Sequence, residues 1–261
     1  MHPVPLAPGN GAEGGEAGPA SIALAKGSYR ARTAADEAGI RAAQALRARC
    51  FGLDTSHDAD PHDAECSHVL IDHVPSERIV CCYRLRRVDR RTIGTCYAAQ
   101  HYALDALEDY DGKMLELGRF CIAPECTDPD VLRLAWAALT DYVDREDVGL
   151  LFGCSSFAGV EAGAYLDAFA ELRARHLAPD RWQPGIRASE VFRFGADATR
   201  VPDRKRAAAQ MPPLLRTYLL MGGWVSDHAV VDREMNTLHV FTGVEVGAIP
   251  ESRKRLLRAL V

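Results

Sequence analysis

The chain has 261 residues, of which 48% are hydrophobic, 26% charged and only 7% aromatic. These proportions are typical of a globular protein with a buried core, and they exclude collagen-like, coiled-coil and wholly disordered chains. The 31 basic and 36 acidic residues leave a net charge of −5, which excludes a bulk nucleic-acid binder but is compatible with local basic patches.

The lack of a recognisable targeting pattern and the use of cysteine indicate the cellular compartment. No stretch reaches the roughly 18 consecutive apolar residues of a membrane-spanning helix. The N-terminus lacks the basic start and apolar core of a secretory signal. The 8 cysteines include no C-x-x-C pair, and Cys81, Cys82, Cys121 and Cys154 lie in apolar runs, as reduced and buried thiols do. We therefore expect a cytoplasmic protein.

The first predicted elements are a tail, a strand and a helix. Residues 1–27 are rich in Pro, Gly, Ala and Glu without periodicity, so we expect a disordered tail. A short strand begins near Tyr29. A helix follows, with Thr33 as its expected N-cap and with Asp36 and Glu37 in its first turn.

The middle of the chain mixes strands and helices. Two β-branched runs separated by Pro75 and Ser76 predict a hairpin, and a third strand runs to Pro124. Asp128 followed by Pro129 predicts the start of a helix. Further strands are expected at residues 148–157, 189–194 and 236–246, and further helices near Tyr165, after Pro213 and at residues 250–261. This order indicates an α/β fold with a mixed, mostly antiparallel central sheet flanked by helices.

A charged pair in the strand at residues 113–124 is the first candidate site. Glu116 and Arg119 stand among apolar residues, and buried charges need partners. Strict alternation would place them on opposite faces of the sheet, but Gly118 between them suggests a β-bulge that brings both to one side. The pair is therefore either a structural salt bridge or part of a functional site.

The acidic loop after the first helix is the second candidate. It holds four aspartates interleaved with histidine and cysteine: Asp54, Asp58, Asp60, Asp63, His57, His62, Cys66 and His68. Three interpretations stay open: a solvated loop, a zinc site, and a pocket whose close carboxylates attract an ammonium group. The spacing matches no standard zinc motif, so we expect no metal.

Three basic clusters stand out on this acidic chain. They are Arg84, Arg86, Arg87, Arg90 and Arg91; Arg204, Lys205 and Arg206; and Arg253, Lys254, Arg255 and Arg258. Solvated faces are the default interpretation. Their segregation on a chain of negative net charge favours an acidic partner or an anionic lipid surface.

Several strings are shared with one enzyme family. They are the two hairpin strands, LELGRFCIAPE (residues 115–125), LLFGCSSF (residues 150–157) and PPLLRTYLLMGGWVSDHAVVDREMNTLHVF (residues 212–241). With these strings the chain resembles bacterial L-ornithine Nα-acyltransferases, which are related to acyl-homoserine-lactone and N-acyl amino acid synthases. The resemblance implies a GNAT-like acyltransferase domain at residues 28–249, followed by a basic amphipathic helix at residues 250–261.

The resemblance also implies the substrates. A 3-hydroxyacyl chain would arrive on acyl carrier protein, L-ornithine would supply its α-amino group, and the product would be lyso-ornithine lipid. The sequence ECTDPDVL after the Glu116 strand lacks the glycines of the usual coenzyme A pyrophosphate loop, which fits a carrier-bound donor without a nucleotide. We therefore expect no cofactor except the phosphopantetheine that the carrier brings.

Site residues follow from the positions that match the family. Glu116 would accept the proton of the amine or position the amine, and Arg119 would orient Glu116 or hold the substrate carboxylate. The expected substrate-binding residues are Asp58, Asp60, Asp63, Tyr83, Arg84, Asp232 and Asn236. The chain departs from the family at Cys81–Cys82, where Gly-Thr often precedes the Tyr-Arg pair.

The basic clusters would serve partners of opposite charge. We expect acyl carrier protein to dock on Arg86, Arg87, Arg204, Lys205 and Arg206, because carrier proteins are strongly acidic. Residues 251–261 would contact anionic lipid on the inner face of the cytoplasmic membrane, and no nucleic acid is expected. Two alternatives stay open: a related acyltransferase with another amine acceptor, and a non-catalytic module that binds acyl carrier protein or lipid.

Overall fold

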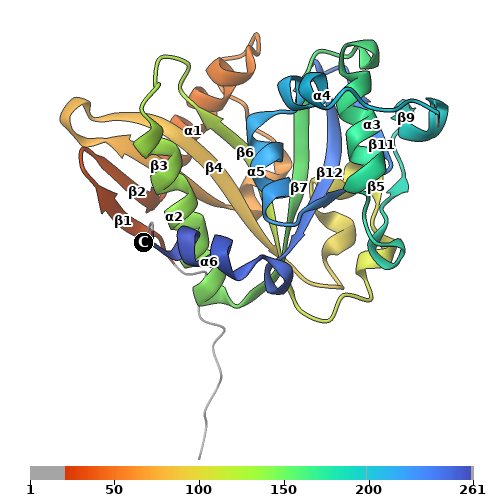
Figure 1. Cartoon of the computed structure of the whole chain (residues 1–261). Helices are drawn as coiled ribbons and strands as arrows, with labels where there is room; N and C mark the ends of the chain where they lie inside the picture. Colours follow the sequence, from red (N-terminus) through yellow and green to blue (C-terminus); the bar gives the residue numbers. More distant parts are fainter. Residues whose placement is uncertain (1–20, 198, 260–261) are drawn as a thin grey trace, which may run out of the picture.

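A mixed β-sheet organises the computed structural model, which describes residues 21–197 and 199–259 (Figure 1). Its 10 strands within these residues lie in the order β1-β2-β3-β4-β6-β7-β12-β11-β9, with β10 paired to β12. All neighbouring pairs are antiparallel except β6 and β7, which run parallel. The mixed, mostly antiparallel α/β fold expected from the sequence is confirmed.

The strands of this sheet are β1 (Ala23–Lys26), β2 (Tyr29–Thr33), β3 (Ser67–His73), β4 (Arg78–Val88), β6 (Lys113–Ile122), β7 (Val148–Ala158), β9 (Val191–Arg193), β10 (Trp224–Val225), β11 (His228–Asp232) and β12 (Thr237–Glu245). The α-helices are α1 (Glu37–Phe51), α2 (Pro129–Glu146), α3 (Leu166–Arg175), α4 (Arg204–Gln210), α5 (Pro213–Leu220) and α6 (Glu251–Arg258). A separate pair joins β5 (Tyr102–Ala103) to β8 (Gly185–Ile186).

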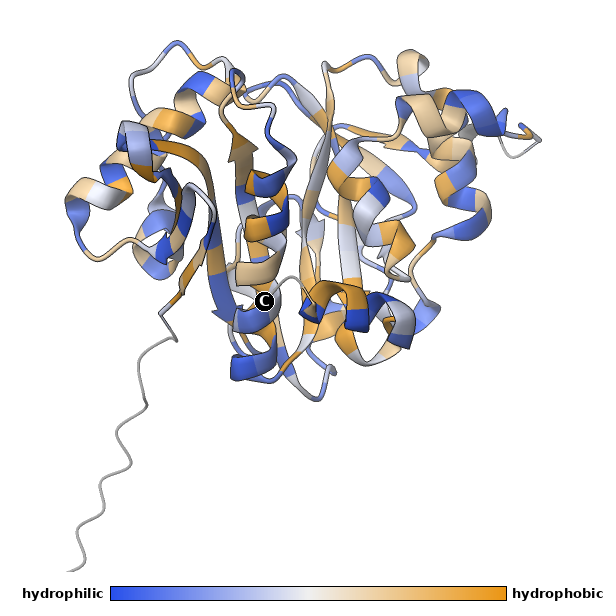
Figure 2. Cartoon of the chain, turned by 60° about the vertical axis from the view of Figure 1, so that its left-hand side comes forward, coloured by the Kyte–Doolittle hydropathy of each residue, from blue (hydrophilic) through white to orange (hydrophobic). Residues whose placement is uncertain are grey.

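Helices cover both faces of the first half of the sheet, because β3 and β4 carry apolar side chains on both faces. Leu70 and Cys82 pack in the cluster that includes residues of α1, whereas Ile71 and Cys81 pack in the cluster that includes residues of α2. In Figure 2 the helices on both sides of the sheet alternate between polar and apolar residues, as amphipathic helices do.

The second half of the sheet is covered differently on its two faces. Helices α3 and α5 pack against Leu238 and Val240 of β12. On the other face, Phe241 and Phe152 pack against the segment of residues 93–107, which has no α-helix. This irregular segment therefore lies over the face of β6, β7 and β12 that carries Glu116.

Two expectations for the N-terminal region are wrong. Residues 23–26 of the expected tail form β1, which pairs with β2, and Ile22 is buried; residues 1–20 lie outside the described residues. Helix α1 is capped by Asp36, whose side chain accepts the N–H of Gly39, and not by Thr33. Thr33 ends β2, and its hydroxyl accepts the N–H of Ile22.

The predicted hairpin β3–β4 and the helix start at Asp128–Pro129 are confirmed. The C-terminal helix also forms, but it packs against the rest of the fold. Arg258 pairs with Asp144 of α2 at 2.9 Å, and Leu257 packs against the main core cluster. None of the helices in the described ranges is both long enough and apolar enough to cross a membrane.

Candidate functional site

A cleft opens where β6 and β7 separate. Their parallel pairing ends at Glu116 and Phe152. Just beyond, the two strands approach each other closely at one point, since a Cβ built on Gly153 would overlap the carbonyl oxygen of Leu117. The cleft has a volume of about 610 Å³ and is bordered by the ends of α1 and β6, by β7, by the start of α5 and by the turn between β11 and β12.

Glu116 lies on this cleft and holds the irregular segment against it. Its side chain is buried, and its two oxygens accept the backbone N–H groups of Tyr97, at 3.1 Å, and Ala98, at 2.7 Å. The carboxylate therefore fixes the position of residues 97–101 in the same way as a capping residue fixes a helix end.

The predicted bulge is confirmed at Arg119. Arg84 pairs with Gly118 and Cys82 pairs with Cys121, so that Arg119 and Phe120 both stand opposite Tyr83. Arg119 has a φ of 54°, the left-handed conformation found in many bulges. Its guanidinium lies 4.8 Å from the ring centroid of Tyr97, whose backbone binds Glu116. The bulge thus brings both charged residues to Tyr97.

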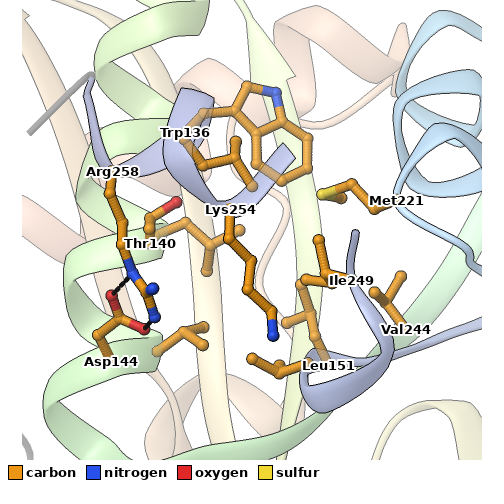
Figure 3. A pocket seen from close by; sticks show the side chains of 13 residues that line it. Trp136, Thr140, Asp144, Leu151, Met221, Val244, Ile249, Lys254 and Arg258 are labelled. Atoms are coloured by element: carbon orange, nitrogen blue, oxygen red, sulfur yellow. Dashed lines mark hydrogen bonds and ion pairs between the residues drawn. The ribbon is translucent and has the colours of Figure 1, made fainter. Parts of the chain in front are cut away.

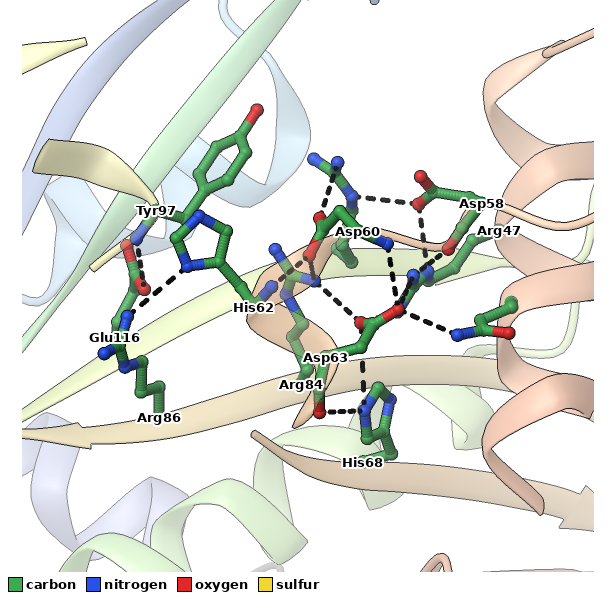
Figure 4. Close-up of polar contacts among 12 residues, drawn as sticks. Arg47, Asp58, Asp60, His62, Asp63, His68, Arg84, Arg86, Tyr97 and Glu116 are labelled. Carbon is green, nitrogen blue, oxygen red and sulfur yellow. Dashed lines mark hydrogen bonds and ion pairs between the residues drawn. The ribbon is translucent and has the colours of Figure 1, made fainter. Parts of the chain in front are cut away.

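Glu116 and Arg119 do not form the salt bridge that the sequence left open. Arg119 instead pairs with Asp58 at 2.9 Å and with Asp60 at 3.1 Å. Arg47 binds Asp58 and Asp63, and Arg84 binds Asp60 and Asp63 (Figure 4). Three arginines and three aspartates therefore form one compensated network.

This network decides among the interpretations of the acidic loop. Burial alone would raise the pKa of Asp63, but hydrogen bonds from Arg47 and Gln44 hold it well below its usual range. Burial would likewise raise the pKa of Asp60, but the hydrogen bond and charge of Arg84 and the charge of Arg119 hold it below its usual value. All three carboxylates are already paired with arginines. The loop is thus not merely solvated, and these aspartates do not leave an uncompensated charge for an ammonium group.

Other predicted residues lie in different surroundings. Tyr83 is fully buried beneath α2, where its hydroxyl donates to the carbonyl of Ala135, and it does not border the cleft. Asp232 and Asn236 do border the cleft, from the turn between β11 and β12. One oxygen of Asp232 accepts the N–H of Met235 at 3.0 Å. Within the described residues, neither Asp232 nor its neighbour Glu234 forms a salt bridge.

The expected docking arginines on β4 are not exposed together. Arg86 is buried, donates to the carbonyl of Thr95 at 2.5 Å and pairs with Glu65. Arg87 is half-exposed and pairs with Glu146 of α2 at 3.1 Å. In contrast, Arg204, Lys205 and Arg206 are all exposed on α4, which leads directly to the Pro212–Leu215 border of the cleft.

Two histidines beside the cleft were not predicted from the sequence. His239 of β12 borders it directly, and His101 borders an adjoining cavity of about 600 Å³ that shares Tyr97, Arg119 and Asp232 with the cleft. The donor atoms of His101, Asp232 and His239 all lie within 4.8 Å of one another. Among the described residues, these three form the single grouping of donor atoms that could be considered as a metal site. No spacing motif joins residues so far apart in the chain.

Several known proteins are similar to this chain in sequence. Residues 43–137 match the acetyltransferase (GNAT) domain family. The chain is 36% identical over 250 residues to an L-ornithine N(alpha)-acyltransferase of Rhodobacter capsulatus, covering 89% of this chain and 96% of that one. An L-ornithine N(alpha)-acyltransferase of Rhizobium meliloti is 32% identical over 254 residues, covering 89% and 86%.

Among solved structures, the fold is similar to FeeM, an N-acyl amino acid synthase from uncultured soil microbes. The TM-score is 0.49 and the sequence identity 12%, over 89% of this chain and 98% of that chain. The sequence identity to the two acyltransferases extends over most of both proteins in each comparison. The chain therefore belongs to the family of L-ornithine N(alpha)-acyltransferases.

Proposed function

We propose that this acyltransferase moves a 3-hydroxyacyl chain from acyl carrier protein to the α-amino group of L-ornithine, giving lyso-ornithine lipid. The family assignment supports an amine acceptor and an acyl donor. The observation that carries the proposal is the two-sided character of the cleft, which has unpaired carboxylates on one side and leads to an apolar cavity on the other.

The side for the amine is formed by the turn between β11 and β12. Asp232 and Glu234 border both the cleft and the adjoining cavity without a cationic partner among the described residues. Carboxylates in such a position attract ammonium groups, and ornithine carries two of them. These residues, with Asn236, take over the role that the sequence analysis gave to the aspartates of the network.

The side for the acyl chain lies between β6 and β7, where two smaller cavities share lining residues with the cleft and with each other. A narrow cavity of about 30 Å³ lies between β6 and β7 and shares Gly118, Ser155 and Leu214 with the cleft. It also shares Leu151 and Val244 with an apolar cavity of about 50 Å³ beneath α6. In Figure 3 the apolar side chains of this last cavity surround the stem of Lys254, and Arg258 closes one side through Asp144. A chain that follows this route ends against Trp136 and Met221.

The reaction needs few further groups. The amine attacks the thioester carbonyl at the point where β6 and β7 separate. Backbone N–H groups freed there by the end of the pairing stabilise the oxyanion that forms. Arg119 keeps the bulge in place through Asp58 and Asp60, and Glu116 keeps residues 97–101 over the site. The sequence suggested Glu116 as the acceptor of the amine proton, but both of its oxygens already accept backbone N–H groups.

The donor and the location follow from the surface. We propose that acyl carrier protein docks on Arg204, Lys205 and Arg206, next to the mouth of the cleft, and brings its phosphopantetheine with it. We also propose a peripheral contact of α6 with anionic lipid. Arg258 and Lys254 are engaged with Asp144 and Glu251, so this contact would rest on Arg253, Arg255 and the exposed Leu256.

A parallel acceptor assay tests the proposal. Purified protein receives 3-hydroxyacyl carrier protein together with radiolabelled ornithine, lysine or another amino acid, and lipid-soluble label is counted. Ornithine-dependent product supports the proposal. Consumption of a different amine would assign the protein to another acceptor, and carrier binding without turnover with any amine would leave only a binding module.

A further inference from the structure

Three polar side chains lie close together on the amine side of the cleft, and two of them are histidines with no role in the proposed function. His101 precedes β5, Asp232 ends β11 and His239 lies in β12, and their donor atoms are within 4.8 Å of one another. Two imidazoles and one carboxylate grouped in this way can hold and transfer a proton. We interpret the cluster as a hydrogen-bonding and proton-transfer site.

The hydrogen bonds of Tyr102 define the tautomer of His239. The Tyr102 hydroxyl has one proton, which it donates to the carbonyl oxygen of His239 at 2.8 Å. The hydroxyl oxygen of Tyr102 also lies 3.1 Å from Nδ1 of His239, and since its proton is already donated, Nδ1 is the donor in that contact. Nε2 of His239 consequently carries a lone pair.

That lone pair is buried without a partner. The His239 side chain is only 2% exposed, and its Nε2 atom has no hydrogen bond among the described residues. Burial, with a smaller effect from His101 and His228, lowers the pKa of His239 to about 3. An unpaired polar atom in the protein interior is uncommon, and a role in catalysis is one explanation for it.

His101 stands between this buried acceptor and the cavity. Its ring lies 4.8 Å from the ring of His239 and 5.3 Å from that of Tyr97, in edge-to-face geometry. Its backbone is fixed independently of the ring, since its N–H donates to Ala98 and its carbonyl accepts the N–H of Ala188. Ala98 is in turn held by Glu116. The ring nitrogens have no hydrogen bond to other described residues, and His101 borders the same cavity as Asp232.

We propose that His101 accepts the proton of the acceptor amine, while Asp232 stabilises the charged ring and His239 orients it. The inference rests on the proposed function. The ammonium group of the acceptor first releases one proton to solvent. As the amine nitrogen forms its bond to the thioester carbonyl carbon, a second N–H proton passes to His101. When the carbon–sulfur bond breaks, that proton passes to the sulfur, which leaves an amide and a thiol.

In this arrangement Glu116 is a positioning residue. It touches Tyr97 and Ala98 through both of its oxygens, and its effect on the reaction passes through residues 97–101. His239 is also a positioning residue, because its ring packs against the ring of His101 and its Nε2 atom is buried. His101 is the catalytic residue, since its ring borders the cavity where the amine would lie.

The test uses steady-state kinetics with 3-hydroxyacyl carrier protein and L-ornithine. We expect H101Q to lower kcat by about 100-fold or more, the usual effect of losing a proton acceptor, with little change in the KM for ornithine or in thermal unfolding. H239Q should lower kcat less. H228Q is the matched control: His228 is also buried with an unpaired Nε2, but it borders neither cavity, so its kcat and KM should equal those of the wild type.

Chemical rescue distinguishes proton transfer from a structural role. Added imidazole should restore part of the turnover of H101A, because it enters the space left by the ring, whereas it should not restore E116Q. The inference would be overturned if H101Q kept the wild-type kcat, or if E116Q lost turnover and H101Q did not. In either case the wild-type enzyme would still acylate ornithine, so the proposed function would stand. A wild-type protein that acylates no amine would refute the proposed function itself and, with it, this inference.

Discussion

At the scale of single residues, Arg47 tests the stability of the arginine–aspartate network. It is 1% exposed and binds both Asp58 and Asp63. Removing one partner of a buried charge pair typically costs about 3–5 kcal/mol, because the remaining charge has no water to replace the partner. We expect R47M to lose about 3 kcal/mol in urea unfolding, since Arg84 and Arg119 still hold the two aspartates.

The control for this prediction is an ion pair in solvent. Arg145 pairs with Asp141 one helical turn away, and both side chains are partly exposed. Such pairs contribute about 0.3–0.5 kcal/mol, so R145M should leave the free energy of unfolding almost unchanged. Equal losses in the two variants would show that the buried network contributes no more to stability than an exposed pair.

The same network predicts a loss of stability in acid. The folded protein holds the pKa values of Asp60 and Asp63 below their usual range, whereas the unfolded chain has values near 3.9. A group with a lowered pKa stabilises the fold above its unfolded value, and this contribution is lost as the pH falls towards the folded value. We expect the free energy of unfolding to be steady from about pH 7 to pH 5 and to fall below about pH 4. A D60N/D63N variant whose stability falls as steeply with acid would contradict this origin.

The residues that the sequence could predict are those that interrupt a local pattern. Glu116 and Arg119 stand out because charges rarely occur in an apolar strand, and Gly118 indicates the bulge. His101 and His239 interrupt no pattern, and only the folding of residues 93–107 over β12 brings them together. Tyr83 shows the opposite case. It matches the Tyr-Arg pair of the family, but its hydroxyl donates to the carbonyl of Ala135 and does not line the cleft.

At the scale of elements, the contact of β6 with β7 at Gly153 determines where the cleft begins. A Cβ at this position would overlap the backbone carbonyl of Leu117, which cannot move away as a side chain can. We expect G153A to cost about 1–3 kcal/mol, as overpacking does, and to lower turnover by displacing the ends of both strands. Thermal unfolding and the acceptor assay measure the two effects.

Gly94 is the matched control for that substitution. It lies in the segment facing β6, and a Cβ built on it would meet nothing within 4 Å. G94A should therefore keep wild-type stability and turnover. If G153A behaved in the same way, the close approach of the two strands would not be what shapes the cleft.

Elements were predictable where apolar periodicity is long, as in α2, β4 and β12. The sequence missed β1 because four residues, ALAK, follow a region rich in Gly and Ala and alternate only between exposed and partly buried positions. Pairing with β2, a tertiary contact, makes this edge strand. The N-cap of α1 is Asp36 and not the expected Thr33 for a related reason, because β2 continues through Thr33, which pairs with Val69.

At the scale of the whole molecule, α6 combines a packing face with an exposed face. Leu257 packs against the core and lines the cavity beneath the helix, whereas Leu256 is 56% exposed. We expect L257D to lower the thermal unfolding temperature and L256D to leave it unchanged. Conversely, L256D should weaken sedimentation with vesicles that contain anionic lipid. Equal vesicle binding by L256D and the wild type would contradict the proposed membrane contact.

The distribution of charge over the whole molecule makes the last prediction. The net charge is −5, so an acidic carrier protein is repelled on average and needs a local basic surface. Of the two expected clusters, the one on β4 is buried or paired at Arg84, Arg86 and Arg87, whereas the α4 cluster is exposed beside the cleft. The triple variant R204E/K205E/R206E should therefore raise the KM for the acyl carrier substrate and reverse its dependence on salt, because screening would now relieve repulsion.

A matched reversal at the other end of the sheet separates docking from a general change of charge. Arg90 and Arg91 are exposed after the end of β4, where β6 begins, and they border a different cavity. R90E/R91E should leave the KM for the carrier substrate nearly unchanged. In both variants the KM for ornithine should stay constant, since neither cluster borders the amine side. The increase in the carrier KM can be divided by the number of reversed charges in each variant. If this increase per charge were the same in both variants, long-range repulsion would explain the effect and α4 would not be the docking surface.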